Sequence, residues 1–319
     1  MNPYWDASFF EFFLIFGKRI FLFLMGHDVF WESDEIQLGT LSAVAASCGL
    51  IGPFLVLKRM AMFANSLSHT ILIGIVLAFL FASKCWEGEM FSLTTLLLGS
   101  FAASLLTAFL TEGLIRFFRL QEDASVGFVF STLFALGVLL VTLFTKDVHL
   151  GTEAIMGNAD ALQPTDFRFA ALLFLFNLSI VTLFYRKLQI SSFDRHYANS
   201  LGISSNMLHF LLLSLSSMIC VSAFRAVGVL LVLAFLTGPF LTARLFSHRL
   251  AVLLFLTPFL GALACFIAVA FSRHFLSFYG FPLSTGGIAV GVIGCMYGLA
   301  IWLKSFFTSI KKSATLTSN

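Results

Sequence analysis

The sequence predicts an all-α fold, a polytopic bundle of transmembrane helices. Hydrophobic residues make up 59% of the 319 residues, charged residues only 11%, and the mean hydropathy is +0.97. A soluble domain carries about 25% charged residues, so this chain has too few charges to cover a water-facing surface. The high apolar content also excludes intrinsic disorder, because burial energy is plentiful. The net charge of +3 is too small to indicate nucleic-acid binding.

Nine runs free of Asp, Glu, Lys and Arg follow one another along the chain. A spanning helix needs about 20 apolar residues, with a range of about 17–25, and these runs are 17 to 30 residues long. Strands of a membrane barrel would be about ten residues long and would alternate polar with apolar residues. The runs therefore predict about nine helical spans. They are Ile36–Leu57, Met60–Ser83, Met90–Thr111, Ala124–Thr145, Phe169–Tyr185, His196–Phe224, Ala226–Ala243, Leu250–Ser272 and His274–Leu303.

The segment before the first run is different. Phe9–Met25 is apolar, but Glu11, Lys18 and Arg19 interrupt it. We interpret it as an amphipathic helix lying in the membrane interface, and a tenth span is the alternative. The expected division is an N-terminal interfacial segment at 1–35, a transmembrane domain at 36–303 and a cytoplasmic tail at 304–319.

The distribution of Lys and Arg predicts the orientation. If Lys58 and Arg59 lie in the cytoplasm, the cytoplasmic loops and tail hold 12 basic residues and the opposite loops five, or seven with Lys18 and Arg19. Most acidic residues fall on the opposite side. The charge rule and the nine-span count agree, and together they place the C-terminus in the cytoplasm.

The sequence lacks the motifs that mark several kinds of catalytic and binding site. The chain has no GxxxxGK[ST] phosphate loop, no HExxH zinc motif, no GxSxG elbow and no CxxC pair. Ion-driven carriers keep several carboxylates within their spans, but here only Glu112 comes close. It precedes Arg116 by four residues, as in an ordinary helical ion pair. We therefore expect the energy source in another subunit. His209, within an apolar run, is expected to pack in the core.

Three segments, in order, resemble the permease subunits of bacterial ABC-type importers of manganese, zinc or iron(II). The resemblance extends from about residue 36 to 303. The segments are Lys58–Gly74, Phe193–Ile203, and Arg225–Pro239 followed by Thr242–Arg244.

The resemblance implies a permease that moves a divalent metal cation across the bacterial cytoplasmic (inner) membrane. It implies three partners: a cytoplasmic ATP-binding subunit that hydrolyses ATP, a second permease chain, the same or related, and an extracytoplasmic metal-binding protein. This chain would not itself be an enzyme and would hold no permanent cofactor. The alternative is a stand-alone ion-coupled secondary carrier, which would need no ATPase.

The second run contains a candidate metal site. Asn65 and His69 are four residues apart, so they project from one helical face. The resembling family carries Asp at the position of Asn65 and His at that of His69. Imidazole and oxygen ligands accept manganese, zinc and iron alike. Since Asn65 brings no charge, either the site is weaker here or the second permease supplies a carboxylate. The alternative for His69 is a packing role.

The basic loop between the fifth and sixth runs contains a candidate coupling helix. Asp194 suits a helix N-terminus and Gly202 a helix end. Ala198 and Gly202 are four residues apart and would share a smooth helical face. The family's Ala-x3-Gly coupling motif implies that this helix docks on the ATPase. An ordinary capped loop helix is the alternative.

The seventh run and one exterior loop carry further candidates. Gly228, Gly238 and Pro239 allow close packing and a bend in the seventh span, as a gate or only as a packing kink. The loop 146–168 is acidic and too short to fold alone. It is expected to dock the metal-binding protein or simply to stay solvated. Its candidate residues are His149, Glu153, Asp160 and Asp166.

Overall fold

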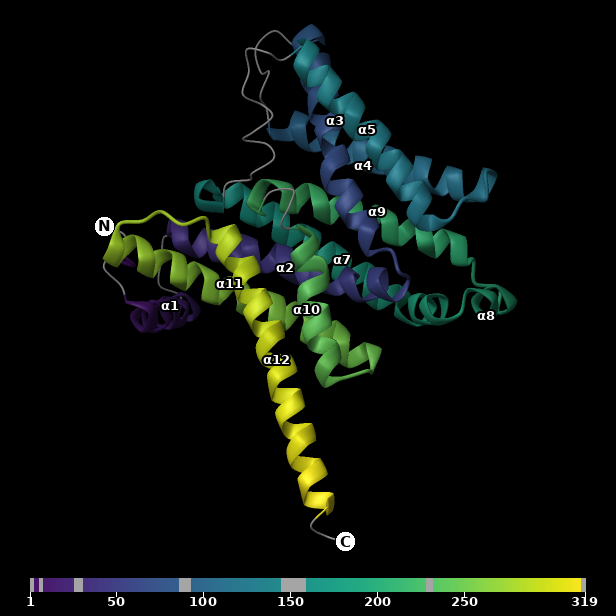
Figure 1. The fold of residues 1–319 in the computed structure, drawn as a ribbon. Helices are drawn as coiled ribbons and strands as arrows, with labels where there is room; N and C mark the ends of the chain where they lie inside the picture. The colour runs from purple at the N-terminus through teal and green to yellow at the C-terminus, as the bar shows by residue number, and fades with distance from the viewer. Residues whose placement is uncertain are drawn as a thin grey trace.

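A computed structural model describes residues 3–5, 8–25, 31–85, 93–144, 159–227 and 232–316. Within these ranges the chain is helical and contains no strand (Figure 1). The helices are α1 (Phe9–Leu24), α2 (Ser33–Leu57), α3 (Ala61–Cys85), α4 (Leu93–Phe117), α5 (Glu122–Phe144), η1 (Ala159–Ala161), α7 (Pro164–Phe193), α8 (Arg195–Ser200), α9 (Ser205–Val227), α10 (Val232–Phe246), α11 (Leu250–Tyr279) and α12 (Thr285–Leu316).

The described helices confirm the predicted membrane bundle. Seven of them, α2, α4, α5, α7, α9, α11 and α12, contain segments long and apolar enough to cross a bilayer. Shorter apolar segments, His69–Phe81 in α3 and Val232–Phe246 in α10, complete the set. Each of the nine corresponds to one of the nine apolar runs in the sequence.

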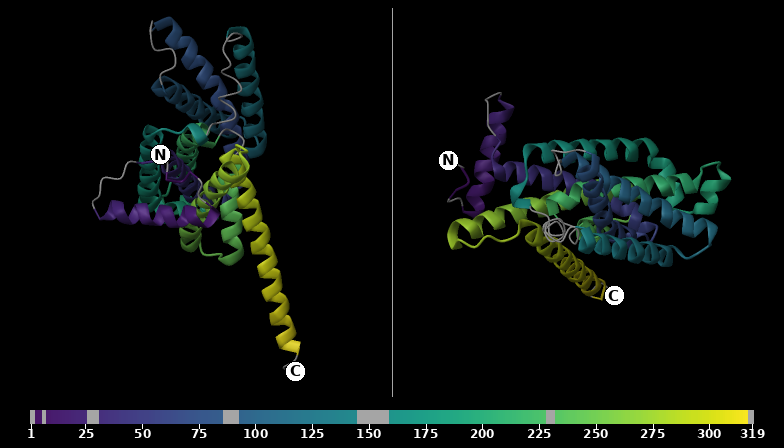
Figure 2. Two further views of the ribbon diagram at one scale, coloured as in Figure 1. Left: turned by 90° about the vertical axis from the view of Figure 1, so that its left-hand side faces the viewer. Right: turned by 90° about the horizontal axis from the view of Figure 1, so that it is seen from above.

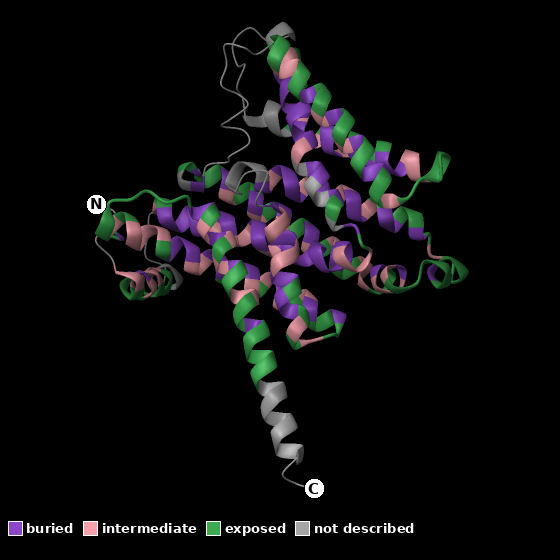
Figure 3. Ribbon diagram, in the orientation of Figure 1, coloured by how far each residue is buried: buried purple, intermediate pink, exposed green. Residues whose placement is uncertain are grey.

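Helix α2 forms the centre of the bundle. It packs against α7, α9, α10 and α11, and most of its length is buried (Figure 3). Two glycines let neighbouring backbones approach it closely. A Cβ atom at Gly49 would lie 2.6 Å from the backbone nitrogen of Pro258, and one at Gly52 would collide with the carbonyl oxygen of Leu236. Small residues at helix contacts allow this packing within a membrane.

Helices α3, α4 and α5 pack together and project from one side of the bundle, and α12 projects from the opposite side (Figures 1 and 2). The contact between α3 and α4 is also made through glycines, since a Cβ at Gly74 would collide with the carbonyl oxygen of Gly99. Gly74 therefore serves close helix packing.

Helix α1 lies across the direction of α7, α9 and α11 in both views of Figure 2. Its 16 residues are fewer than a span usually needs. Its end nearest α2 is anchored by an ion pair between Arg19 and Glu35, and the Tyr4 hydroxyl donates to the same carboxylate at 2.7 Å. These features favour the interfacial interpretation of Phe9–Met25, which stays a prediction.

One predicted boundary is wrong. The sequence predicts a break between spans at Arg273, but α11 runs through this residue to Tyr279 and ends at Gly280, whose φ is +64°. The partly buried Arg273 is tolerated because it pairs with Asp34 at 3.5 Å and donates to the carbonyl of Tyr4 at 3.2 Å. At the C-terminal end, α12 continues to Leu316, so residues 304–316 are helical, and their assignment to a cytoplasmic tail stays a prediction.

Candidate functional site

The predicted coupling segment forms a short capped helix. Asp194 ends α7 and caps α8, where its Oδ1 accepts a hydrogen bond from the backbone nitrogen of Tyr197 at 2.9 Å. Gly202 adopts a φ of +75°, and the Ile203 nitrogen returns to the Ala198 carbonyl at 3.0 Å. A left-handed glycine with this return bond is a common helix ending. The predicted caps at both ends of the segment are therefore confirmed.

The prediction that Ala198 and Gly202 share a smooth exposed face of one helix is wrong. Ala198 is 0% exposed, so its side chain points into the chain itself. Gly202 follows the helix rather than belonging to it, because α8 ends at Ser200. The exposed residues of α8 and its flanks include three large aromatic or aliphatic ones, since Phe193, Tyr197 and Leu201 are all more than half exposed.

Hydrogen bonds fasten α8 to the start of α9. The Asn199 side chain accepts a hydrogen bond from the backbone nitrogen of Ser205 at 3.2 Å. Arg195 donates to the side-chain oxygen of Asn206 at 2.6 Å and lies 3.8 Å from Glu122 of α5. The two helices are therefore linked by side-chain hydrogen bonds, so a displacement of α8 is transmitted to the start of α9.

Lys58, just after α2, connects the central helix with the end of α7, which leads into α8. Its Nζ donates to the hydroxyl of Ser191 near the end of α7, at 3.2 Å. Burial lowers the pKa of Lys58 from 10.5 to about 8, and the positive charge of Arg195 acts in the same direction.

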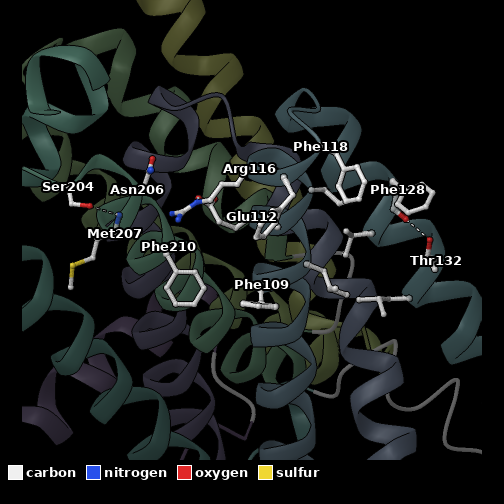
Figure 4. Close-up of a pocket in the computed structure, with 16 residues that line it drawn as sticks. Phe109, Glu112, Arg116, Phe118, Phe128, Thr132, Ser204, Asn206, Met207 and Phe210 are labelled. Atoms are coloured by element: carbon white, nitrogen blue, oxygen red, sulfur yellow. Dashed lines mark hydrogen bonds and ion pairs between the residues drawn. The ribbon is translucent and has the colours of Figure 1, made fainter.

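An apolar cavity of about 890 Å³ opens between α4, α5 and the start of α9 (Figure 4). Its volume and mainly apolar lining are typical of ligand-sized pockets. Glu112 and Arg116 are the charged residues in its wall. The other lining residues that Figure 4 labels are Phe109, Phe118, Phe128, Thr132, Ser204, Asn206, Met207 and Phe210.

Glu112 has a second partner that the sequence did not reveal. The predicted pair with Arg116 is confirmed, with the Arg116 Nε donating to Glu112 Oε1 at 2.6 Å. The other carboxylate oxygen faces Nε2 of His209 in α9 at 3.2 Å. His209 is buried, as expected, but it contacts a carboxylate rather than only apolar side chains. A contact between residues on separate spans leaves no spacing pattern in the sequence.

The candidate metal residues lie on α3. The ring of His69 is half-buried and lies 5.3 Å from the ring of Phe130 and 5.5 Å from that of Phe134, both in α5. Asn65 is one helical turn earlier, but its side chain lies outside the described part of the structure. Across the described residues, no group of three or more His, Cys, Asp or Glu side chains could hold a metal ion.

The remaining candidates are distributed as follows. Helix α10 continues through Pro239, and a Cβ at Gly238 would collide with the Ile293 side chain of α12, so Gly238 serves helix packing. Asp166 caps α7, where it accepts from the backbone nitrogen of Gln163 at 2.8 Å. Asp160 belongs to η1. Gly228, His149 and Glu153 lie outside the described residues.

The bundle, with its buried central helix and its helices long and apolar enough to cross a bilayer, defines a polytopic membrane protein. The model of the ABC 3 transport family matches residues 36–304. The chain therefore belongs to the ABC 3 transport family.

Curated relatives and a solved structure agree with this assignment. The chain is 41% identical over 297 residues to the "Probable metal transport system membrane protein" of Chlamydia trachomatis, covering 93% of this chain and 92% of that one. It is 36% identical over 283 residues to the "Manganese transport system membrane protein MntD" of Bacillus subtilis, covering 85% and 91%. The fold matches that of PsaBC from Streptococcus pneumoniae, solved in complex with Fab, with a TM-score of 0.72, 24% identity, and coverage of 93% and 99%.

Proposed function

We propose that this chain is the membrane permease subunit of an ATP-driven importer of a divalent metal cation, with manganese as the favoured cargo. The observation that carries the proposal is the family match over the whole span region, residues 36–304. Manganese is favoured because the relatives from Bacillus subtilis and Halalkalibacterium halodurans are named for manganese transport. Zinc and iron(II) use the same ligand types and compete on geometry and availability.

The cation passes along α3 beside His69 and Asn65. The imidazole of His69 is held against the rings of Phe130 and Phe134, so a cation there would be partly shielded from bulk water. An imidazole nitrogen and an amide oxygen are two ligands, and first-row cations take four to six. A second permease chain, the same or related, completes the site.

Manganese uptake by the complete transporter tests this site. His69→Ala is expected to lower uptake at limiting manganese by about tenfold or more, the scale on which even outer-shell changes weaken metal sites. Asn65→Asp is expected to raise uptake at limiting manganese, because it restores a charged ligand. His248→Ala is the matched control, since it removes an exposed histidine between α10 and α11. Unchanged uptake in His69→Ala would exclude the ligand assignment.

Helix α8 docks on the cytoplasmic ATP-binding subunit. Asp194, Ala198 and Gly202 shape this helix through its cap, its buried anchor and its left-handed ending. Tyr197 and Leu201 supply the exposed apolar contact. Aromatic residues of this kind are enriched among the residues that carry binding energy.

Co-purification of the ATPase from native membranes tests the docking surface. Tyr197→Asp places a charge in the contact and is expected to remove the ATPase from the purified complex. Phe278→Asp changes a similarly exposed aromatic residue near the end of α11, and is expected to leave the ATPase bound. Retention of the ATPase by Tyr197→Asp would exclude α8 as the main contact.

The remaining parts of the proposal follow from the same family. The transporter lies in the bacterial cytoplasmic membrane, the C-terminus is cytoplasmic, and an extracytoplasmic metal-binding protein delivers the cation. The match over 36–304 supports a permease domain at 36–303. Gly238 and Pro239 of α10, together with Gly228, which lies outside the described residues, are the proposed gating residues of the seventh span.

A further inference from the structure

The contact between Glu112 and His209 is the most unusual polar feature inside the described bundle. The two residues come from different helices, and they are only 6% and 4% exposed. Glu112 Oε2 and His209 Nε2 are 3.2 Å apart, which is an ion-pair distance. Neither atom makes a well-aligned hydrogen bond within the described part of the chain. Buried polar atoms need a polar partner, and in the described structure these two atoms face each other.

His209 belongs to α9, whose first residues are hydrogen-bonded to the coupling helix α8. His209 lies one helical turn after Ser205, in the first turns of α9. Ser205 and Asn206 are the residues that Asn199 and Arg195 of the α8 segment hold by hydrogen bonds at 3.2 and 2.6 Å. A displacement of α8 therefore moves His209 with it.

Glu112 belongs to α4, and α4 contacts α3, the helix that carries the candidate metal residue His69. Earlier in the same helix α4, the Thr107 hydroxyl donates to the hydroxyl of Thr70 at 2.8 Å, and both residues are fully buried. Thr70 is the neighbour of His69. One turn further along α3, Gly74 meets Gly99 with no room for a methyl group. Close-packed helices move together rather than deform.

The cavity beside this contact leaves room for movement. The space of about 890 Å³ lies between the cavity-lining ends of α4, α5 and α9, and Glu112 forms part of its wall (Figure 4). Here α9 can shift relative to α4 without first breaking a dense apolar contact, while the polar pair still joins them.

We propose that the Glu112–His209 contact is the joint through which movement of α8 and α9 reaches α4, and through α4 the metal-carrying helix α3. Both are positioning residues, since neither touches the cation. Arg116 holds the Glu112 carboxylate in place from the other side. The inference rests on the proposed function of α8 and His69, and it adds the path that connects them. Coupling of this kind needs an element with two arrangements, and in the proposal these are the contact as described and the contact separated when α9 shifts at the cavity.

The experiment uses the complete transporter in vesicles and measures two quantities, manganese imported and ATP hydrolysed. Their ratio reports coupling, whereas a purely structural role would change the amount of folded complex and leave the ratio unchanged. The variants are Glu112→Gln, His209→Leu and the conservative His209→Gln, which keeps a donor toward Glu112. Ser216→Ala is the matched control, because Ser216 is buried in the same helix α9 and bonds only to its own helix, at Leu212.

His209→Leu and Glu112→Gln are expected to lower the manganese imported per ATP by about fivefold or more, the lower end of allosteric coupling. His209→Gln is expected to recover most of the ratio, and Ser216→Ala to leave it unchanged. An unchanged ratio in His209→Leu and Glu112→Gln would overturn the proposal. So would loss of folded complex in His209→Gln and Glu112→Gln, because the pair would then be structural. Failure of the proposed function itself is distinguishable, since the unmodified transporter would then show no ATP-dependent uptake.

Discussion

Replacing Gly74 by Ala tests the close contact between α3 and α4. The added methyl carbon would lie 2.6 Å from Cβ of Ala103 and 2.8 Å from the carbonyl carbon of Gly99. Carbon atoms prefer separations of about 3.5–4.0 Å, so the helices must separate by roughly 1 Å. Overpacking costs about 1–3 kcal/mol, and the upper end applies because backbone must move. Alanine regains about 1 kcal/mol of helix propensity. The net loss in free energy of unfolding is about 2 kcal/mol.

Thermal unfolding in detergent measures this loss. Gly113→Ala is the matched control, because Gly113 lies in α4 and a Cβ there would meet nothing within 4 Å. Gly74→Ala is expected to lower the midpoint by several degrees. Gly113→Ala should leave the midpoint unchanged or raise it, since only helix propensity changes. A midpoint for Gly74→Ala at or above that of the unmodified chain would refute the close α3–α4 packing, and with it one step of the proposed joint.

Three further changes test other parts of the structure. The pKa of Lys58 is about 8 in the folded chain, below its ordinary value of 10.5, because burial disfavours the charged form. Between these two values the unfolded chain binds more protons than the folded chain, so stability rises with pH there. Lys58→Met should abolish that rise and stabilise the chain at pH 7 by about 2–3 kcal/mol; midpoints equal to those of the unmodified chain at pH 7 and 10 would contradict this. Asp194→Ala removes the α8 cap, worth about 1 kcal/mol, and should reduce the ATPase recovered in co-purification, while Asp194→Asn should retain it. Gly49→Ala should lower the unfolding midpoint by several degrees, because its Cβ would meet the backbone of Pro258 at 2.6 Å; no change would argue against the tight α2–α11 contact.

The sequence predicted what depends on local pattern. The length of each apolar run sets the length of a spanning helix, and the nine runs correspond to the nine apolar helical segments. Asp194 and Gly202 mark the two ends of α8 because capping depends on a few neighbouring residues.

The errors concern contacts between distant parts of the chain. Arg273 looked like a boundary because its partner Asp34 comes from the start of α2. The spacing of Ala198 and Gly202 could not indicate that α8 ends at Ser200, before Gly202, or that Ala198 faces the chain's own interior. The contact between Glu112 and His209 depends on the packing of α4 against α9, which no periodicity in either helix encodes.

The central claim is that ATP hydrolysis in a separate subunit drives transport, and transport by the purified complex tests it most directly. The complete transporter is placed in vesicles, and manganese uptake is compared with and without ATP, and under an ion gradient alone. The proposed function predicts uptake that requires ATP and the ATP-binding subunit, with none under the gradient alone. A chain that purifies without an ATPase and still imports manganese under the gradient would contradict it. That result would identify a stand-alone ion-coupled carrier built on the same fold.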